Sequence, residues 1–231
     1  MTKASVIRNL ARITAFLAVL FLPGSLLNGQ DYRYGIYISP LISWFRTDID
    51  EVKNEGARAG FDFFITAERN LTRNWSFISG LGFITSGGRL KSSKADVFRF
   101  PDYTATVAEG QPVIYKIQYI TIPVGIRVKT EEIGYLTYFA EFGLDPKVVV
   151  SGKVDIPSAH IRNERAMTEI RRINMGYHLN AGIDYSIDGS TSLVLGLGFE
   201  NNFFDITKDI DGQEKDRTSQ KFLKFIFGVN F

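Results

Sequence analysis

The last ten residues of the chain alternate between apolar and mostly small or polar side chains. One parity is entirely apolar: Leu223, Phe225, Phe227, Val229 and Phe231. The other parity is mixed: Phe222, Lys224, Ile226, Gly228 and Asn230. Because successive side chains of a β-strand point to opposite faces, this period of two predicts a strand with one fully apolar face. Such a face at the chain terminus is typical of the strand that closes and inserts a transmembrane β-barrel, and we expect Phe225, Phe227, Val229 and Phe231 to form it.

Seven other segments alternate in the same way, which predicts eight strands in all. The eight segments are Tyr34–Phe45, Ala57–Arg69, Trp75–Thr85, Tyr119–Lys129, Tyr135–Val148, Ile170–Ile187, Leu193–Phe203 and Phe222–Phe231. A helix would scatter these apolar residues around its circumference. Most segments are long enough for the roughly 9–11 residues with which a tilted strand crosses a bilayer.

Glycine gives a partly independent test of this assignment, since the parity is set by the apolar residues. The strand glycines fall on the non-lipid parity: Gly35, Gly60, Gly80, Gly82, Gly125, Gly143, Gly176, Gly182, Gly196, Gly198 and Gly228. An eight-stranded barrel has an interior only just wide enough for its side chains, so many inward positions must be small. The glycine pattern therefore favours a narrow closed barrel.

The connections between the predicted strands alternate in length. They span residues 46–56, 70–74, 86–118, 130–134, 149–169, 188–192 and 204–221, and every second one is short. Outer-membrane barrels have short periplasmic turns and longer outer loops, so this pattern predicts that both termini lie in the periplasm. An aqueous β-sandwich would also alternate, but it would have to bury its apolar faces against a second sheet. We therefore predict an all-β fold, a monomeric eight-stranded antiparallel up-and-down transmembrane β-barrel.

The first thirty residues carry basic side chains followed by a short apolar run that ends at Pro23. This order predicts a signal peptide over residues 1–29, cleaved after Gly29, and a barrel domain over residues 30–231. The alternative is a membrane anchor, but the uninterrupted run is about half of the ~20 residues that a spanning helix needs. Export combined with these strands predicts the bacterial outer membrane. The chain has no cysteine, which excludes disulfides, a lipoprotein anchor and thiol chemistry.

One stretch resembles a known family. Residues 119–156 read YITIPVGIRVKTEEIGYLTYFAEFGLDPKVVVSGKVDI, and this is similar to the central hairpin of PorT-family outer-membrane β-barrel proteins of the Bacteroidota. The shared features are an aromatic residue before an Ile-Pro-aliphatic strand, a short turn with glycine, and a Tyr-rich strand. The resemblance extends more loosely over all eight strands. It implies an outer-membrane location, a small barrel and an association with type IX protein secretion.

The lumen-facing parity collects charges of both signs. They are Arg58, Asp62, Glu68, Arg127, Lys129, Glu141, Asp145, Arg172, His178, Asp184, Glu200 and Lys224. Charges enclosed in a narrow barrel must pair, so these residues predict an interior network of salt bridges and hydrogen bonds that holds the barrel closed. The alternative is a path for protons or ions.

Two histidines invite a catalytic interpretation. His178 lies opposite Glu200 or Gly198 in the two possible registers, but no serine stands two residues from it, so a structural role is favoured over a Ser-His-acid site. His160 lies near Ser158 in a predicted outer loop. The acidic stretch from Thr207 to Gln220 departs from a calcium loop at its first and last ligand positions and is interpreted as a solvated loop. We expect no catalytic residue, metal site or cofactor.

The predicted partners follow from the location. Membrane lipids and lipopolysaccharide surround the barrel, and basic residues at the start of the longest loop could contact lipopolysaccharide phosphates: Arg89, Lys91, Lys94 and Arg99. The barrel-assembly machinery acts during insertion, and secretion-system proteins are further candidates. The formal charge of +2 gives no argument for nucleic acid. The leading hypothesis is a non-enzymatic barrel that serves as an envelope component or as an accessory of a secretion machine; the alternatives are a lipid-modifying enzyme and a small pore.

Overall fold

The computed structural model describes residues 32–100, 103–208 and 217–231. The described strands are β1 (Tyr32–Arg46), β2 (Val52–Gly56), β3 (Arg58–Asn70), β4 (Trp75–Ser92), β5 (Asp96–Arg99), β6 (Thr104–Val107), β7 (Pro112–Thr121), β8 (Val124–Lys129), β9 (Leu136–Ile156), β10 (Ile161–Arg165), β11 (Ile173–Ser186), β12 (Ser192–Asn202) and β13 (Ser219–Asn230). A short 3-10 helix, η1 (Pro157–Ala159), precedes β10. The predicted signal peptide lies outside the described residues. Among those residues, no helix is both long and apolar enough to cross a membrane.

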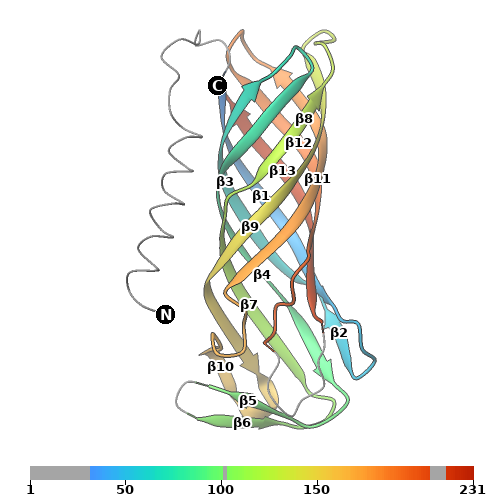
Figure 1. Ribbon diagram of the computed structural model, residues 1–231, viewed down its shortest axis with the longest axis vertical. Coiled ribbons are helices and arrows are strands. Elements are labelled where there is room, and N and C mark those ends of the chain that lie inside the picture. The colour runs from blue at the N-terminus through green and yellow to red at the C-terminus, as the bar shows by residue number, and fades with distance from the viewer. Residues whose placement is uncertain (1–31, 101–102, 209–216) are drawn as a thin grey trace. The chain divides into compact units, whose positions relative to one another are not determined.

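The strands close into a ring (Figure 1). Its neighbours are β1, β3, β4, the pair β7 and β8, then β9, β11, β12 and β13, which returns to β1, and all these pairings are antiparallel. The strands β7 and β8 occupy one place in the ring and are separated at Ile122 and Pro123, where proline cannot donate to the ladder. This ring confirms the predicted eight-stranded antiparallel barrel. Closure pairs the backbone around the circumference and leaves no strand edge toward lipid.

The two faces of the ring differ as the alternation requires. On β13 the side chains of Leu223, Phe225 and Phe227 are exposed on the outside, whereas Phe222 and Lys224 are buried inside. The same outward apolar row continues on the neighbouring strands, for example at Ile36, Ile38, Leu193, Leu195 and Leu197. In water this band would be unfavourable, so it is suited to contact with acyl chains.

One end of the barrel carries tight turns and the chain's C-terminus (Figure 1). The turn between β11 and β12 is held by Asp188, whose carboxylate accepts hydrogen bonds from the backbone N–H groups of Ser190 (2.9 Å) and Thr191 (2.7 Å). These bonds favour the ionised carboxylate and lower the pKa of Asp188.

The other end, which we call the loop end to distinguish it from the turn end just described, is built from strand extensions. The predicted connections 86–118 and 149–169 are shorter than expected, because β4 continues to Ser92, β7 begins at Pro112 and β9 reaches Ile156. In the pairing of β7 with β9 the register shifts between Gln118 and Tyr119, where β9 has one extra residue. As a result, the inward positions of β9 are odd-numbered up to Val149 and even-numbered from Gly152. This shift breaks the simple alternation on which the sequence assignment relied.

An apolar core fills the lumen at this end. Residues of the barrel wall such as Phe45, Tyr115 and Ile117 pack against Phe98 and Phe100 from the hairpin region of β5 and β6. The same cluster contains Ile84, Leu90, Val107, Val113, Tyr119, Val154, Ile156, Ile170, Ile206 and Phe222. We call this set the apolar plug.

Gly143 shows how tightly the interior is packed. A Cβ there would lie 2.5 Å from His178 Cε1 and 2.5 Å from the Val124 carbonyl oxygen. We expect Gly143→Ala to lower the free energy of unfolding by about 1–3 kcal/mol, because the backbone of β8 cannot yield cheaply. Gly189→Ala is the control, since nothing lies within 4 Å of that Cβ position. Urea unfolding in lipid vesicles measures both, and equal effects of the two substitutions would contradict the tight packing.

Candidate functional site

The candidate site is the polar half of the lumen, between the apolar plug and the end with tight turns. Ten of the twelve charged residues predicted to face the lumen have buried or half-buried side chains there: Asp62, Glu68, Arg127, Lys129, Glu141, Asp145, His178, Asp184, Glu200 and Lys224. They come from β3, β8, β9, β11, β12 and β13, so only ring closure brings them together.

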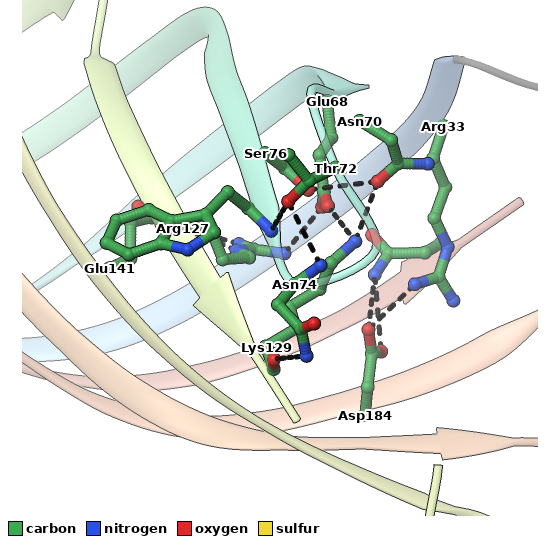
Figure 2. Close-up of polar contacts among 12 residues, drawn as sticks. Arg33, Glu68, Asn70, Thr72, Asn74, Ser76, Arg127, Lys129, Glu141 and Asp184 are labelled. Carbon is green, nitrogen blue, oxygen red and sulfur yellow. Dashed lines mark hydrogen bonds and ion pairs between the residues drawn. The ribbon is translucent and has the colours of Figure 1, made fainter. Parts of the chain in front are cut away.

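Arg127 on β8 is the centre of the first cluster. Its Nε donates to Glu141 Oε2 (2.9 Å), and its Nη1 donates to Glu68 Oε2 (3.0 Å). The guanidinium also lies over the Phe139 ring, with 4.5 Å from Cζ to the ring centroid. Lys129 Nζ donates to Glu68 Oε1 at 2.5 Å, and Figure 2 shows both cations pointing from β8 toward the residues of β3. One guanidinium therefore links β8 to its neighbour β9 and, beyond β4 on the other side, to β3.

His178 joins the same cluster from β11. Its Nδ1 lies 2.9 Å from Asp145 Oδ2, and its Nε2 lies 3.1 Å from Glu141 Oε1. In the strand register His178 stands opposite Glu200, one of the two alternatives that the sequence left open. Its side-chain contacts are nevertheless made to β9. With a carboxylate at each ring nitrogen, His178 has no nitrogen directed at a nucleophile.

Lys224 and Lys147 form the second cluster around Glu200. Lys224 Nζ lies 2.9 Å from Asp62 Oδ2 and 2.8 Å from Glu200 Oε2. Lys147 is paired with Glu200 and also donates to Asn202 Oδ1 (3.2 Å). The sequence interpretation missed Lys147, although it shares the inward parity of Asp145 on the same predicted segment. That parity was the signal that could have identified it.

Asp184 anchors a third cluster at the turn end of the lumen. It pairs with Arg33 Nη1 (2.8 Å), and it accepts hydrogen bonds from Ser192 Oγ (2.7 Å) and Asn230 Nδ2 (3.2 Å). Tyr37 links this cluster to the first, because its hydroxyl donates to Asn230 Oδ1 (2.6 Å) and accepts from Arg127. Figure 2 shows Arg33 and Asp184 facing one another.

Two residues predicted for the lumen lie elsewhere, which corrects the sequence interpretation. Arg172 is exposed, because β11 begins only at Ile173 and the pleat does not extend to it. Arg58 is half-buried and lines a separate groove with Lys116 and Lys153, at the point where β3 begins. Parity holds only inside a regular strand, and both residues lie at a strand boundary.

The candidate residues of the predicted outer segments that the structure describes lie outside the three lumen clusters. His160 is exposed and has a positive φ of 56° after η1. In the basic segment Arg89 is exposed and Lys91 lies 4.0 Å from Glu55, while the side chain of Arg99 is outside the described part. The five acidic and glycine residues of the calcium-like segment, Asp209, Asp211, Gly212, Glu214 and Asp216, also lie outside the described residues.

A cavity of about 60 Å³ lies between the first and second clusters, lined by Tyr37, Asp62, His178 and Lys224 among others. Several buried polar atoms here and beside Glu200 have no hydrogen-bond partner among the described residues, including Asp62 Oδ1 and Asn180 Oδ1. A volume of this size holds about four water molecules, and such atoms are the partners that buried water takes. Ser39 also lines the cavity, but the space is too small for a lipid substrate. Within the described part of the chain, no group of three or more acidic or histidine side chains could hold a metal ion.

Comparison with known proteins agrees with this architecture. The profile of a family described as "Outer membrane protein beta-barrel domain" matches residues 28–208. No curated protein sequence matches the chain.

The chain is also similar to solved structures of outer-membrane proteins. Neisserial surface protein A (NspA) has a TM-score of 0.50 at 10% identity, over 86% of this chain and 95% of NspA. Ail, the attachment invasion locus protein of Yersinia pestis, has a TM-score of 0.42 at 12% identity, over 87% of this chain and 99% of Ail. The outer membrane protease OmpT of Escherichia coli has a TM-score of 0.46 at 8% identity, over 90% of this chain and 99% of OmpT. At such low identity the likeness to NspA shows the fold alone.

Proposed function

Since this chain belongs to the outer membrane protein beta-barrel domain family and resides in the bacterial outer membrane, we propose that it is a non-enzymatic, non-conducting envelope component. In this proposal the barrel is a rigid scaffold that presents its loop end to other molecules outside the cell. The turn end and both termini face the periplasm, as short turns do in such barrels.

The observation that carries this proposal is the filled lumen. Ion pairs and hydrogen bonds occupy the polar half, and the apolar plug occupies the rest. The cavity between the two charged clusters is of water size. An ion crossing the barrel would have to break buried ion pairs and then pass through apolar side chains, both of which are costly.

Conductance measurements test this proposal directly. We expect the purified protein in planar lipid bilayers to show no stable single-channel currents at moderate voltage. The apolar plug predicts that removing residues 93–111, which contain β5 and β6, raises conductance above this silent baseline. Stable channels in the intact protein would contradict the proposal and favour the small-pore alternative.

The resemblance of residues 119–156 to the PorT family supports a more specific role. We extend the proposal to an accessory role in protein secretion, with the outer loops or periplasmic turns as contact surfaces. Co-purification from mildly solubilised membranes, followed by mass spectrometry, is expected to recover secretion-system proteins. A lone species, together with secretion unchanged by deletion of the gene, would end this part of the proposal.

Two further tests address processing and catalysis. For the proposed signal peptide, N-terminal sequencing of the mature protein is expected to begin at Gln30; retention of residues 1–29 would contradict it. For the non-enzymatic role, His178→Ala and His160→Ala are expected to leave the lipid A profile of the cell unchanged. A changed profile in either variant would favour the lipid-modifying enzyme.

A further inference from the structure

A polar groove of about 270 Å³ lies on the outer wall of the barrel near its loop end. On β7 the side chains of Tyr115 and Ile117 are buried in the apolar plug, so Lys116 and Gln118, which have the opposite parity, face outward. Lys153 is exposed on the adjacent strand β9 and is paired in register with Lys116. The groove is therefore open toward the surroundings of the barrel and not toward the lumen.

The groove lies at the border of the apolar band that is nearest the loop end. Ile120 and Val148 are paired and exposed on the outer wall, as expected for residues in contact with acyl chains. Within the next two residues of β7 the outward side chain becomes Gln118, paired with Thr85 on β4 and Ser151 on β9. Lys116 and Lys153 follow one step further from the band. The outer wall therefore changes over about 14 Å along the strand. It carries first an apolar row, then a row of hydroxyl and amide groups, and then a cationic row.

The charge of the groove is positive. Lys116 pairs with Asp155 (Nζ to Oδ2, 2.5 Å) and donates to Asn163 Oδ1 (2.6 Å), which fixes its ammonium group. Burial raises the pKa of Asp155, but the hydrogen bonds from Lys116 and from the backbone N–H of Asn163, followed by the charges of Lys116 and Arg58, outweigh it, so the pKa lies below its usual value. The groove is thus lined by three cations, Arg58, Lys116 and Lys153, of which Lys116 is paired with Asp155.

We propose that this groove binds the phosphate group of an outer-leaflet lipid, whose acyl chains lie along the adjacent apolar band. The inference rests on the proposed orientation, in which the loop end faces outward. Guanidinium and ammonium donors form strong charge-assisted hydrogen bonds to phosphate, and Gln118 and Ser151 add neutral donors at the level where a lipid headgroup begins. A soluble anion would contact only the polar and cationic side chains, whereas a lipid would also place its acyl chains against the apolar row.

The test is a titration of the purified full chain in detergent micelles, followed by native mass spectrometry. The probes are diphosphorylated lipid A, the same lipid after dephosphorylation, and inorganic phosphate. We expect the protein to bind the phosphorylated lipid at least about tenfold more tightly than the dephosphorylated one. We expect R58Q/K116Q/K153Q to remove this preference while leaving binding of the dephosphorylated lipid unchanged.

The matched control is R46Q/R217Q/K221Q, which removes the same number of charges from a second groove, beside β1 and β13 at the same end of the barrel. We expect it to keep the preference. Lys153→Gln alone covers the case in which the triple variant does not fold, because Lys153 is exposed; we expect an intermediate loss that Lys153→Arg restores.

Three results would overturn the proposal: equal binding of the two lipids, equal losses in the groove and control variants, or displacement of the lipid by micromolar inorganic phosphate. The last result would identify a site for a free anion. Binding in micelles does not depend on orientation. Labelling of a cysteine introduced at position 53 or 188 in intact cells tests the orientation separately. A wrong orientation can therefore be distinguished from a groove that does not bind phosphate.

Discussion

Replacing Arg127 with leucine is expected to lower the free energy of unfolding by about 3–5 kcal/mol, the usual result of removing one partner from a buried ion pair. Arg127 has only 3% of its surface exposed, and it pairs with Glu68 (3.0 Å) and Glu141 (2.7 Å). Without the guanidinium, Glu141 keeps His178 and Asn180, and Glu68 keeps Lys129, but each loses a charge-assisted partner in a lumen with little water. Urea unfolding of the barrel in lipid vesicles, followed by tryptophan fluorescence, measures the loss.

Two companion variants separate the ion pairs from a general effect of losing a cation. Arg73→Leu removes a cation from the exposed turn between β3 and β4 and is expected to change stability by no more than about 0.5 kcal/mol. The double variant R127L/E141Q removes the arginine together with one carboxylate and leaves the ion pairs Lys129–Glu68 and His178–Asp145 in place. It is expected to recover a substantial part of the stability. Equal losses in Arg127→Leu and Arg73→Leu would show that the lumen cluster does not stabilise the barrel.

A charge placed on the lipid-facing side is expected to destabilise in a manner that depends on depth. Leu197→Arg, near the middle of β12, should lower the free energy of unfolding by about 2–4 kcal/mol in lipid vesicles. Leu193→Arg, near the turn end of the same strand, should cost only about 0–1 kcal/mol, because the guanidinium can reach the interface. Both leucines are about half exposed (55% and 44%), so exposure alone does not distinguish them.

The comparison of the two leucines is its own control. In a water-soluble sandwich, arginine at either exposed position would have a small effect. The expected difference in the free energy of unfolding between the two variants therefore depends on the hydrocarbon layer. It should disappear in a solvent without such a layer. Similar, small effects at both positions in vesicles would contradict a transmembrane barrel.

The ring was predictable from the sequence because a strand in a narrow membrane barrel has strong requirements on both faces. At Phe225 lipid requires an apolar side chain, and at Gly143 the interior requires a small one, so local alternation defines each strand. The loop end lacks these requirements. There β9 continues past Val149 outside the apolar band, and the bulge shifts its parity, so the sequence predicted a loop where the structure has a strand.

The candidate site was predictable only in composition. Parity collected most of the lumen charges, but pairing depends on which strands face each other across the ring. His178 contacts Asp145 and Glu141 on β9 instead of its register partner Glu200, which pairs with Lys147 and Lys224. Tyr37 and Asn230 connect two clusters through hydrogen bonds that no charge pattern reveals. These contacts form only when the ring closes, so they cannot be predicted from the sequence of any one strand.

The most direct test of the central claim is a nitroxide scan of β13 in lipid vesicles. The chain has no cysteine, so single cysteines can be introduced from Phe222 to Asn230 and labelled without further changes. We predict that collision with oxygen alternates along the strand, high at residues 223, 225, 227 and 229 and low at the residues between them, while a water-soluble nickel complex is excluded from the odd positions. Access of the nickel complex to those odd positions, or high oxygen collision at the even ones, would contradict a barrel whose apolar outer face meets lipid.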